Sequence, residues 1–545
     1  MNGGPLNHSI LTWVTFLPAI GAAVLMLMPR NDRILRWTAL ITSLVTFAFS
    51  MHIVRFFDYT QSGFQPQFNI DRVWIAGLGI HYHLGVDGIS MWLVLLTAFL
   101  VPLSVLVSWK SIHDRVKEFF VLLLLLETAM IGVFLALDMF LFYVFWEATL
   151  IPMALLIGMY GHERRIYAAV KFFLYTMVAS VFMLIAIIWL YTHAHSFDYQ
   201  TVREWIANQH AASAATLQWL FLGFFIAFAV KVPLFPLHTW LPDAHVEAPT
   251  AGSVLLAGVL LKMGTYGLLR FNVGMFPTQA QTNATWINVL AIIGIIYGAL
   301  VALVQPNLKK LIAYSSVSHL GFVVLGIFTF TQAGTDGAVY QMLNHGVSTG
   351  ALFMLAGMLY ERKHTYDFKE YGGLATPMPV FATFFLIAVL SSVGLPLLNG
   401  FVGEFLVLSG AFQDKAIYGI LGASGVIWAA WYLLWMYQRV FYGPITHDEN
   451  RTLPDLDARE QISLWPVAVM ALIMGVASPF WMKSIDPSVA TLRTGGSSKP
   501  ETAQGRPQRT QATTQAITTE ATCSPASPCS SAPSVVRTLA DKDKQ

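Results

Sequence analysis

The feature that most constrains this chain is a series of apolar runs, each about twenty residues long. A helix of about 20 apolar residues crosses the hydrocarbon core of a bilayer. About fourteen such runs follow one another, and the chain is 56% hydrophobic and only 11% charged, where soluble domains carry about 25% charged residues. The sequence therefore predicts an all-α polytopic membrane protein. The runs lie near 7–28, 34–57, 86–108, 116–137, 139–160, 166–192, 215–237, 249–270, 285–304, 309–331, 337–360, 378–410, 416–442 and 462–482.

Lysine and arginine are unevenly distributed among the short loops between these runs. They gather in alternate loops, and the intervening loops are poor in both. Because cytoplasmic loops carry the excess of Lys and Arg, the alternation predicts an even number of spans with both chain ends on the non-cytoplasmic side. Residues 1–9 lack the basic segment of a cleavable signal, so we expect the first run to remain a helix. The basic residues are Arg30, Arg33, Arg36, Lys110, Arg115, Lys117, Arg164, Arg165, Lys309, Lys310, Arg362, Lys363, Lys369, Arg451 and Arg459.

The C-terminal segment differs in kind from the rest. Residues 490–545 are rich in Ser, Thr, Ala, Pro and Gln, without apolar periodicity, which is typical of a disordered tail. Both cysteines, Cys523 and Cys529, lie in it, and an incidental pair is favoured over a metal or disulfide role. The helical part has no thiolate to hold an iron–sulfur cluster. The net charge of +2 gives no reason to expect a nucleic-acid partner.

Several ionisable residues fall in the middle of apolar runs. A charge at the bilayer centre costs about 2.5–3.5 kcal/mol on insertion scales, so helices that keep one usually use it. Such a charge can also serve only as half of a structural ion pair. A lone buried histidine is more often a hydrogen-bonded core residue than a ligand. Charges of both signs on separate helices instead favour a proton or ion path. The mid-span residues are Glu127, Glu147, Lys231, Lys262 and Glu404, with His319 and His345 at similar depth.

Other basic residues near the ends of runs have a simpler interpretation. Arg270, Lys171 and Arg439 are expected to extend their charged groups to the membrane interface.

Two of the charged positions coincide with helix-breaking residues. Pro233 and Pro236 follow Lys231, and a Gly- and Pro-containing stretch from 394 to 403 precedes Glu404. Broken helices at bilayer depth are tolerated where they line a hydrated cavity or are buried in protein. A weak similarity between KFFLYTMVASVFML, from residue 171, and QMLNHGVSTGALFML, from residue 341, fits two inverted five-helix repeats. The prediction is thus a fold with broken helices 7 and 12.

These expectations divide the chain into five parts. The boundaries are 1–110 for helices 1–3, 111–275 for the first repeat (helices 4–8), 280–445 for the second repeat (helices 9–13), 446–489 for a loop and helix 14, and 490–545 for the tail.

Three long strings carry a family resemblance. They are FYVFWEATLIPM from residue 142, KVPLFPLHTWLPDAHVEAPTAGSVLLAGVLLKMGTYGLLR over 231–270, and LKKLIAYSSVSHLGF over 308–322. With the surrounding sequence they resemble the antiporter-like subunits of respiratory complex I, a family that also includes subunits of cation/proton antiporters and membrane-bound hydrogenases. FWEATLIPM, and a glutamate at 404 where sibling subunits usually carry lysine, favour the M (chain 4) branch.

The resemblance implies a proton-translocating membrane subunit of NADH:quinone oxidoreductase, active as part of that enzyme and without a redox centre of its own. NADH, FMN, iron–sulfur clusters and quinone would belong to partner subunits. The partners would be the other membrane subunits, including sibling antiporter-like subunits, in the inner (plasma) membrane of a bacterium. The alternatives are a subunit of a multi-subunit Na⁺/H⁺ antiporter or of a membrane-bound hydrogenase, or a structural membrane anchor.

The resemblance also implies roles for the mid-span residues. Glu147 would lie beside Lys231, Lys262 near the middle and Glu404 at the exit, with His319 and His345 bridging the centre through water. An adjacent carboxylate favours the charged form of a buried lysine, and its removal lets desolvation release the proton. Histidine suits the relay because its unperturbed pKa is about 6.5. Glu127 has a supporting role.

Overall fold

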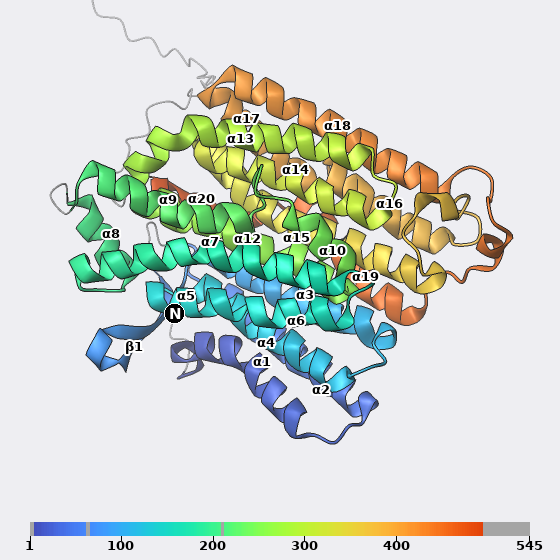
Figure 1. The fold of residues 1–545 in the computed structure, drawn as a ribbon, viewed down its shortest axis with the longest axis horizontal. Coiled ribbons are helices and arrows are strands. Elements are labelled where there is room, and N and C mark those ends of the chain that lie inside the picture. Colours follow the sequence, from blue (N-terminus) through green and yellow to red (C-terminus); the bar gives the residue numbers. More distant parts are fainter. Residues whose placement is uncertain (1–4, 61–65, 209–211, 494–545) are drawn as a thin grey trace, which may run out of the picture. The chain divides into compact units, whose positions relative to one another are not determined.

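The computed structural model describes residues 5–60, 66–208 and 212–493. Within them, twelve helical segments are long and apolar enough to cross a membrane (Figure 1). Ten are single helices: α1 (Ile10–Leu27), α2 (Asp32–Phe56), α3 (Ser90–Ser111), α4 (Val116–Leu135), α7 (Arg165–Ala194), α9 (Ala214–Lys231), α13 (Pro277–Leu303), α14 (Leu308–Phe328), α15 (Gln332–Lys363) and α18 (Ala416–Phe441).

The other two segments are composite. Helices α5 (Met139–Ala148) and α6 (Leu150–Tyr160) follow each other directly. The eighth span, Thr250–Val273, is entirely buried inside the protein. It alternates α-helix with π-helix, a form common at functional sites. Its parts are α11 (Thr250–Leu255), a π-helical stretch (Leu256–Leu260), α12 (Leu261–Gly267) and a second π-helical stretch (Leu268–Val273).

The remaining two expected spans are interrupted. The run near 378–410 forms α16 (Pro379–Val393) and α17 (Asn399–Asp414), each too short to cross a membrane alone. The run near 462–482 forms α19 (Ala458–Val476), which meets α20 (Pro479–Arg493) at 69° and makes a thirteenth span if the pair is counted as one. The prediction of about fourteen helical runs with a broken helix 12 is thus confirmed.

The broken seventh helix is also as expected. Helix α9 ends at Lys231, and after a turn containing Pro233 and Pro236 the chain resumes as α10 (Trp240–Glu247). Both α9 and α10 pack along α7, so they follow one line (Figure 1). The break follows from chemistry, because proline has no backbone N–H and its ring clashes with the preceding helical turn. The division into two inverted repeats stays a prediction.

One boundary differs from the expected one. Helix α20 continues through Arg493, so residues 490–493 are helical and do not belong to a disordered tail. Their helix is anchored by burial of Ile485, Val489 and Leu492. The rest of the expected tail, including Cys523 and Cys529, lies outside the described residues.

A small hairpin supplements the all-helical prediction. Strands β1 (Gln67–Ile75) and β2 (Ile80–Val86) pair antiparallel between α2 and α3. Gly79 closes the turn in the left-handed conformation, at φ +61°, which glycine adopts without steric cost. This hairpin adds a polar connection at one end of the helices.

Polar residues fix where several helices begin. Asn31, Asp138 and Asn307 accept hydrogen bonds from backbone N–H groups in the first turns of α2, α5 and α14. Asp457 forms a capping box with Glu460 at the start of α19. These side chains pair N–H groups that have no partner within the helix, so the short polar segments of the sequence become helix starts.

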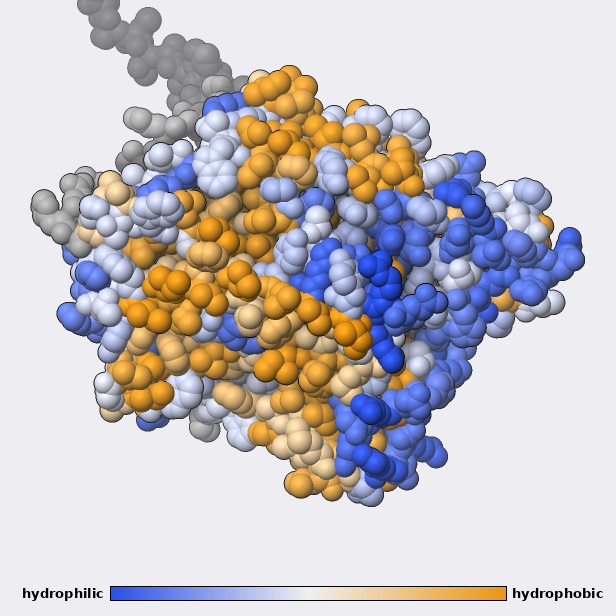
Figure 2. Space-filling model, viewed as in Figure 1, coloured by the Kyte–Doolittle hydropathy of each residue, from blue (hydrophilic) through white to orange (hydrophobic). Residues whose placement is uncertain are grey.

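The basic loops gather at one end of the helices. Lys110 pairs with Asp457 at 2.7 Å, and Arg362 pairs with Glu460 at 2.6 Å, which joins loops far apart in sequence. Figure 2 shows hydrophilic residues concentrated at this end and an apolar surface over the neighbouring helices. At the opposite end, His83 contacts Asp198 at 3.0 Å. The loops therefore alternate between two ends, as the charge pattern predicts for a multi-pass membrane protein.

Candidate functional site

Lys231 ends α9 directly before the break in the seventh span. Its side chain is fully buried, and its ammonium nitrogen has no hydrogen-bond partner among the described residues. The nitrogen lies 5.4 Å from the ring centre of Trp146 and 5.5 Å from that of Phe172. The faces of these two aromatic rings attract a buried cation weakly, but they cannot accept a proton from it.

Glu147 lies near Lys231 but does not pair with it directly. Its carboxylate interacts electrostatically with Lys231 and with the hydroxyls of Ser180 and Tyr143. No nitrogen–oxygen contact within 4.0 Å joins the two charges in the described part of the chain. Glu147 and Lys231 are thus neighbours, as expected. Movement of Glu147, or entry of a water molecule between the two groups, can change how strongly they interact.

Lys262 and His345 form the centre of the site. Lys262 lies on α12 between the two π-helical stretches, and its ammonium contacts Nδ1 of His345 at 2.6 Å and the carbonyl oxygen of Ala257. Both side chains are buried. Because Nδ1 of His345 accepts this bond, a neutral His345 carries its proton on Nε2. That Nε2 has no protein partner, so it is the atom available for onward transfer.

His319 and Glu404 form a second pair. Nδ1 of His319 lies 3.0 Å from a Glu404 oxygen, and both side chains are buried. The ring centres of His319 and His345 are 6.0 Å apart. No hydrogen bond joins the two rings among the described residues, so a proton passing between them needs an intervening group such as a water molecule. Four of the expected residues thus lie in one file: Lys262, His345, His319 and Glu404.

Near each of the two helix breaks, a glycine lets its backbone pack closely against a neighbouring segment. A Cβ atom on Gly264 would lie 2.8 Å from a Val232 methyl group, so glycine lets α12 pack against the end of α9. Gly394 ends α16 in the left-handed conformation, at φ +83°, and a Cβ atom there would lie 3.1 Å from Glu404. Glycine at these positions brings the backbone next to the charged side chains.

A hydrogen-bonded network continues from Glu404 across the twelfth span. Gln341 donates to Glu404 at 3.0 Å, and Asn344 donates to the Gln341 oxygen at 3.0 Å. Asn399, at the start of α17, donates to the carbonyl oxygen of Asn344 at 3.3 Å. These amides tie α17 to α15 at the depth of the break.

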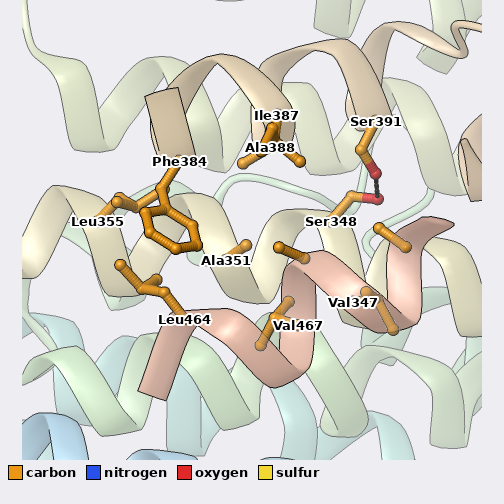
Figure 3. A pocket seen from close by; sticks show the side chains of 12 residues that line it. Val347, Ser348, Ala351, Leu355, Phe384, Ile387, Ala388, Ser391, Leu464 and Val467 are labelled. Atoms are coloured by element: carbon orange, nitrogen blue, oxygen red, sulfur yellow. Dashed lines mark hydrogen bonds between the residues drawn. The ribbon is translucent and has the colours of Figure 1, made fainter. Parts of the chain in front are cut away.

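The network ends at two serines beside a small cavity. Ser348 and Ser391 lie 2.6 Å apart, and Ser391 donates to Asn399 (Figure 3). The cavity has a volume of about 10 Å³, and its other walls are apolar side chains of α15, α16 and α19. Because the serine hydroxyls already bond to each other and to Asn399, they hold the break in place.

Glu127 is not brought to this file. It is fully buried on α4, and neither carboxyl oxygen has a partner among the described residues. No charged side chain pairs with this carboxyl group in the described part of the chain. The supporting role of Glu127 stays a prediction, because its carboxyl group contacts none of these four residues.

Arg270 corrects the expectation for basic residues near span ends. Its guanidinium is buried and pairs with buried Asp87 instead of extending to the interface. Asp87 also accepts the N–H groups of Ile89 and Ser90 at the start of α3. Sequence reasoning missed Asp87 because it lies at the very start of the third apolar run, where an acidic residue is ordinary. Lys171, in contrast, pairs with Asp243 at 2.7 Å while remaining partly exposed.

Two further buried groups were assigned to loops by the sequence. His245 lies on α10 with both ring nitrogens unpaired, within electrostatic range of Lys262 and Lys309. Lys309 is buried and donates to the Ala248 carbonyl oxygen at 2.6 Å. The signal that could have placed His245 was the break at Pro233, because a broken span continues on its far side.

Taken together, the site is a chain of ionisable groups without a metal-binding arrangement. Among the residues that the structure describes, no three His, Cys, Asp or Glu side chains lie close enough to hold a metal ion. The groups are buried, comprise three bases and a terminal carboxyl group, and include two short contacts whose histidine rings face each other with centres 6.0 Å apart. Such an arrangement can pass protons between neighbouring side chains.

Comparison with known families gives a match over the same region. Residues 136–427 match the family described as NADH:quinone oxidoreductase/Mrp antiporter, transmembrane. Over 500 residues the chain is 47% identical to NADH-quinone oxidoreductase subunit M of Rhodobacter capsulatus, covering 89% of this chain and 96% of that protein. It is 40% identical to NADH-ubiquinone oxidoreductase chain 4 of Marchantia polymorpha, covering 89% and 97% respectively.

Solved structures give the same fold. A chain of respiratory complex I from Thermus thermophilus superposes with a TM-score of 0.81 at 32% identity, covering 89% of this chain and 99% of that one. A chain of the Mrp complex from Dietzia shares the fold, with a TM-score of 0.79 at 18% identity, covering 90% and 98% respectively.

Proposed function

Because the chain belongs to the family of NADH-quinone oxidoreductase M subunits, we propose that it is the proton-translocating M subunit of a respiratory NADH:quinone oxidoreductase. It is a multi-pass membrane protein, and its activity is that of the whole enzyme. NADH oxidation and quinone reduction take place in partner subunits, which bind NADH, FMN, iron–sulfur clusters and quinone. The other membrane subunits, sibling antiporter-like subunits among them, are its direct partners in a bacterial inner membrane, with both chain ends on the non-cytoplasmic side.

The observation that carries this proposal is the file from Lys262 to Glu404. Two contacts, Lys262–His345 at 2.6 Å and His319–Glu404 at 3.0 Å, are separated by a histidine–histidine gap of 6.0 Å. Buried ionisable groups in membrane proteins are expensive and mark proton relays. A static ion pair would need one partner for each charge, whereas here a base faces a base at the centre.

The proposed transfer uses the atoms that the geometry presents. Lys262 gives a proton to Nδ1 of His345, and the proton on Nε2 of His345 leaves to a water in the gap. That water gives a proton to Nε2 of His319 as the proton on Nδ1 of His319 passes to the facing Glu404 oxygen, which leads it to the exit. Each step forms one N–H or O–H bond and breaks one.

The first half of the chain supplies the trigger. Glu147 and Lys231 interact without direct contact, so a small displacement of Glu147 changes how strongly the protonated form of Lys231 is stabilised. When the carboxylate moves away, desolvation favours neutral Lys231, and its proton moves toward Lys262. Redox chemistry in distant subunits biases this two-state element.

The test is proton pumping by the assembled enzyme in membrane vesicles. Lys262→Met removes the central proton carrier and keeps the side chain's length. We expect NADH-driven acidification to be lost and quinone reduction to slow strongly, while the enzyme still assembles. Lys110→Met is the matched control, because Lys110 is a surface lysine paired with Asp457. Normal pumping by Lys262→Met would show that the buried pair is only structural.

A further inference from the structure

A polar cavity of about 370 Å³ lies at the basic end of the helices, where α1 ends and α2 and α4 begin. Because one water molecule takes up about 30 Å³ in the liquid, the cavity has room for a group as large as a phosphate. None of its lining residues belongs to the file from Lys262 to Glu404. The polar side chains that line it are Arg30, Asp32, His113, Arg115, Lys117 and Glu118.

The two acidic residues of this cavity each have a basic neighbour. Glu118 lies 3.4 Å from Arg30, and Asp32 lies 3.9 Å from Arg36. Each carboxylate is therefore balanced by one guanidinium. The charge that the cavity offers to a ligand comes from the basic residues that remain.

Two basic residues, Arg115 and Lys117, remain without an acidic partner. In the part of the chain that the structure describes, no carboxylate oxygen lies within 4.0 Å of either side chain. The Lys117 ammonium donates one hydrogen bond, to the carbonyl oxygen of Met26 at 2.7 Å, and keeps two further N–H groups. Arg115 directly precedes α4, and its side chain is exposed. The cavity therefore has an excess of positive charge and favours an anion.

An exposed apolar surface begins where this positive charge ends. Leu27 follows Met26 at the end of α1 and is 88% exposed. On α2, Ile34, Trp37 and Ile41 are exposed, and their spacing of three and four residues places them along one face of the helix. Figure 2 shows apolar residues meeting hydrophilic ones at the bottom of the molecule, where Figure 1 places α1 and α2. The basic cavity and an apolar strip thus adjoin on the same two helices.

Two tryptophans indicate the depth of the cavity in the membrane. Trp37 of α2 packs edge-on against Trp109, near the end of α3, with ring centres 5.3 Å apart. Tryptophan is enriched where a membrane protein crosses the interface between lipid and water. The cavity, lined by Asp32 and Leu35 in the first turn of α2, therefore lies at the level of the lipid headgroups.

We propose that this cavity binds the phosphate of an anionic glycerophospholipid, whose acyl chains lie along Leu27, Ile34 and Ile41. Basic pockets between transmembrane helices bind lipid headgroups of this kind. A soluble anion would match the positive charge but would leave the adjoining apolar strip unused, whereas a lipid carries both parts in one molecule. The site goes beyond the proposed function, because it involves none of the proton-path residues.

Photolabelling of the assembled enzyme tests the site. The enzyme is reconstituted into phosphatidylcholine vesicles that contain phosphatidylglycerol with a photoreactive group in one acyl chain. We expect label on the peptides that contain Leu27, Ile34 and Ile41. Unlabelled phosphatidylglycerol should displace it, whereas soluble glycerol phosphate should not. Displacement by glycerol phosphate would identify a site for a soluble anion and overturn the lipid. Absence of label from these peptides would show that the surface is covered by a partner subunit and would also overturn it.

Variants of opposite charge should change the labelling in opposite directions. The double variant Arg115→Gln/Lys117→Gln removes the unbalanced charge, and glutamine can still donate to the Met26 carbonyl oxygen. Since one basic residue near a membrane surface contributes about fivefold to lipid attraction, labelling at low phosphatidylglycerol should fall about fivefold for each charge removed. Glu118→Gln removes a negative charge and should increase the labelling. Unchanged labelling in both would overturn the proposal.

The matched control is Lys310→Gln/Lys369→Gln. It removes two positive charges from the same end of the protein, outside the cavity, and should leave the labelling as in the wild type. An equal loss in this control would reduce the effect to general surface charge and overturn the site. Lys262→Met separates the two proposals, since it should stop pumping and keep the label. Normal pumping by Lys262→Met contradicts only the proposed function, and wild-type labelling of the cavity variants contradicts only the lipid site.

Discussion

Lys262 and His345 come from different halves of the chain, yet the Lys262 ammonium lies 2.6 Å from Nδ1 of His345. Both are buried, and no carboxylate of the described residues lies within hydrogen-bond distance of the lysine. Burial favours the neutral form of such a lysine, whereas its hydrogen bonds favour the charged form. The pair can therefore exchange a proton at small cost, which is what a relay requires.

His345→Gln tests whether this pair carries protons or only holds the helices together. Glutamine can still accept a hydrogen bond from Lys262, but it cannot take up and pass on a proton. We expect pumping in vesicles to fall at least as far as in His345→Ala, with assembly preserved. Pumping at the wild-type rate in His345→Gln would identify a purely positional role.

Glu404 should tolerate replacement by another protonatable group better than by an inert one. Glu404→Lys keeps a group that can take and release a proton and should retain part of the pumping. Glu404→Ala leaves His319 and Gln341 facing an empty space and should stop it. The comparison is made on the ratio of protons pumped to NADH oxidised, and full activity of Glu404→Ala would remove Glu404 from the path.

Glu127→Leu should leave pumping unchanged. Both Glu127 oxygens are buried without a partner, so the group contributes an unsatisfied polar site, which costs about 1–3 kcal/mol. Leucine removes that cost, and the detergent-solubilised enzyme should unfold at a higher temperature. A large loss of pumping in a well-assembled Glu127→Leu enzyme would restore the supporting role that the sequence suggested.

Asp87→Ala should destabilise the subunit through Arg270. Breaking a buried ion pair by removing one partner typically costs about 3–5 kcal/mol, because an uncompensated charge remains. Asp87 also caps α3, so the effect includes loss of two backbone hydrogen bonds. Thermal unfolding of Asp87→Ala, Arg270→Met and the double variant gives the coupling. If the two effects simply add, the pair does not interact as the structure indicates.

His162 makes the stability depend on pH. It lies between the fifth and sixth spans, and burial together with Lys309 lowers its pKa to about 4 from the usual 6.5. The unfolded chain therefore binds more protons than the folded one between these values, and stability is lost as pH falls from about 6.5 toward 4. His162→Gln, which can still accept from Tyr360, should show a smaller loss of unfolding temperature between pH 7.5 and pH 5. An unchanged loss would assign the pH dependence to other groups.

The sequence by itself determined the number and order of the apolar helices, because hydrophobic length alone decides what crosses a bilayer. It also located the breaks, since proline and glycine act on their own local backbone. Lys231, Lys262 and Glu404 stood out as charges in apolar runs, and this signal needs no knowledge of neighbours. The three sequence strings that resemble antiporter-like subunits then identified the protein family.

Only the tertiary structure decided which of these charges meet. Glu127 and Lys262 look alike in sequence, yet one is isolated and the other contacts His345, because contact depends on which helix faces pack together. Asp87 gave no signal, since an aspartate at the start of an apolar run is ordinary. Its role comes from the Arg270 guanidinium, which a distant part of the chain brings to it.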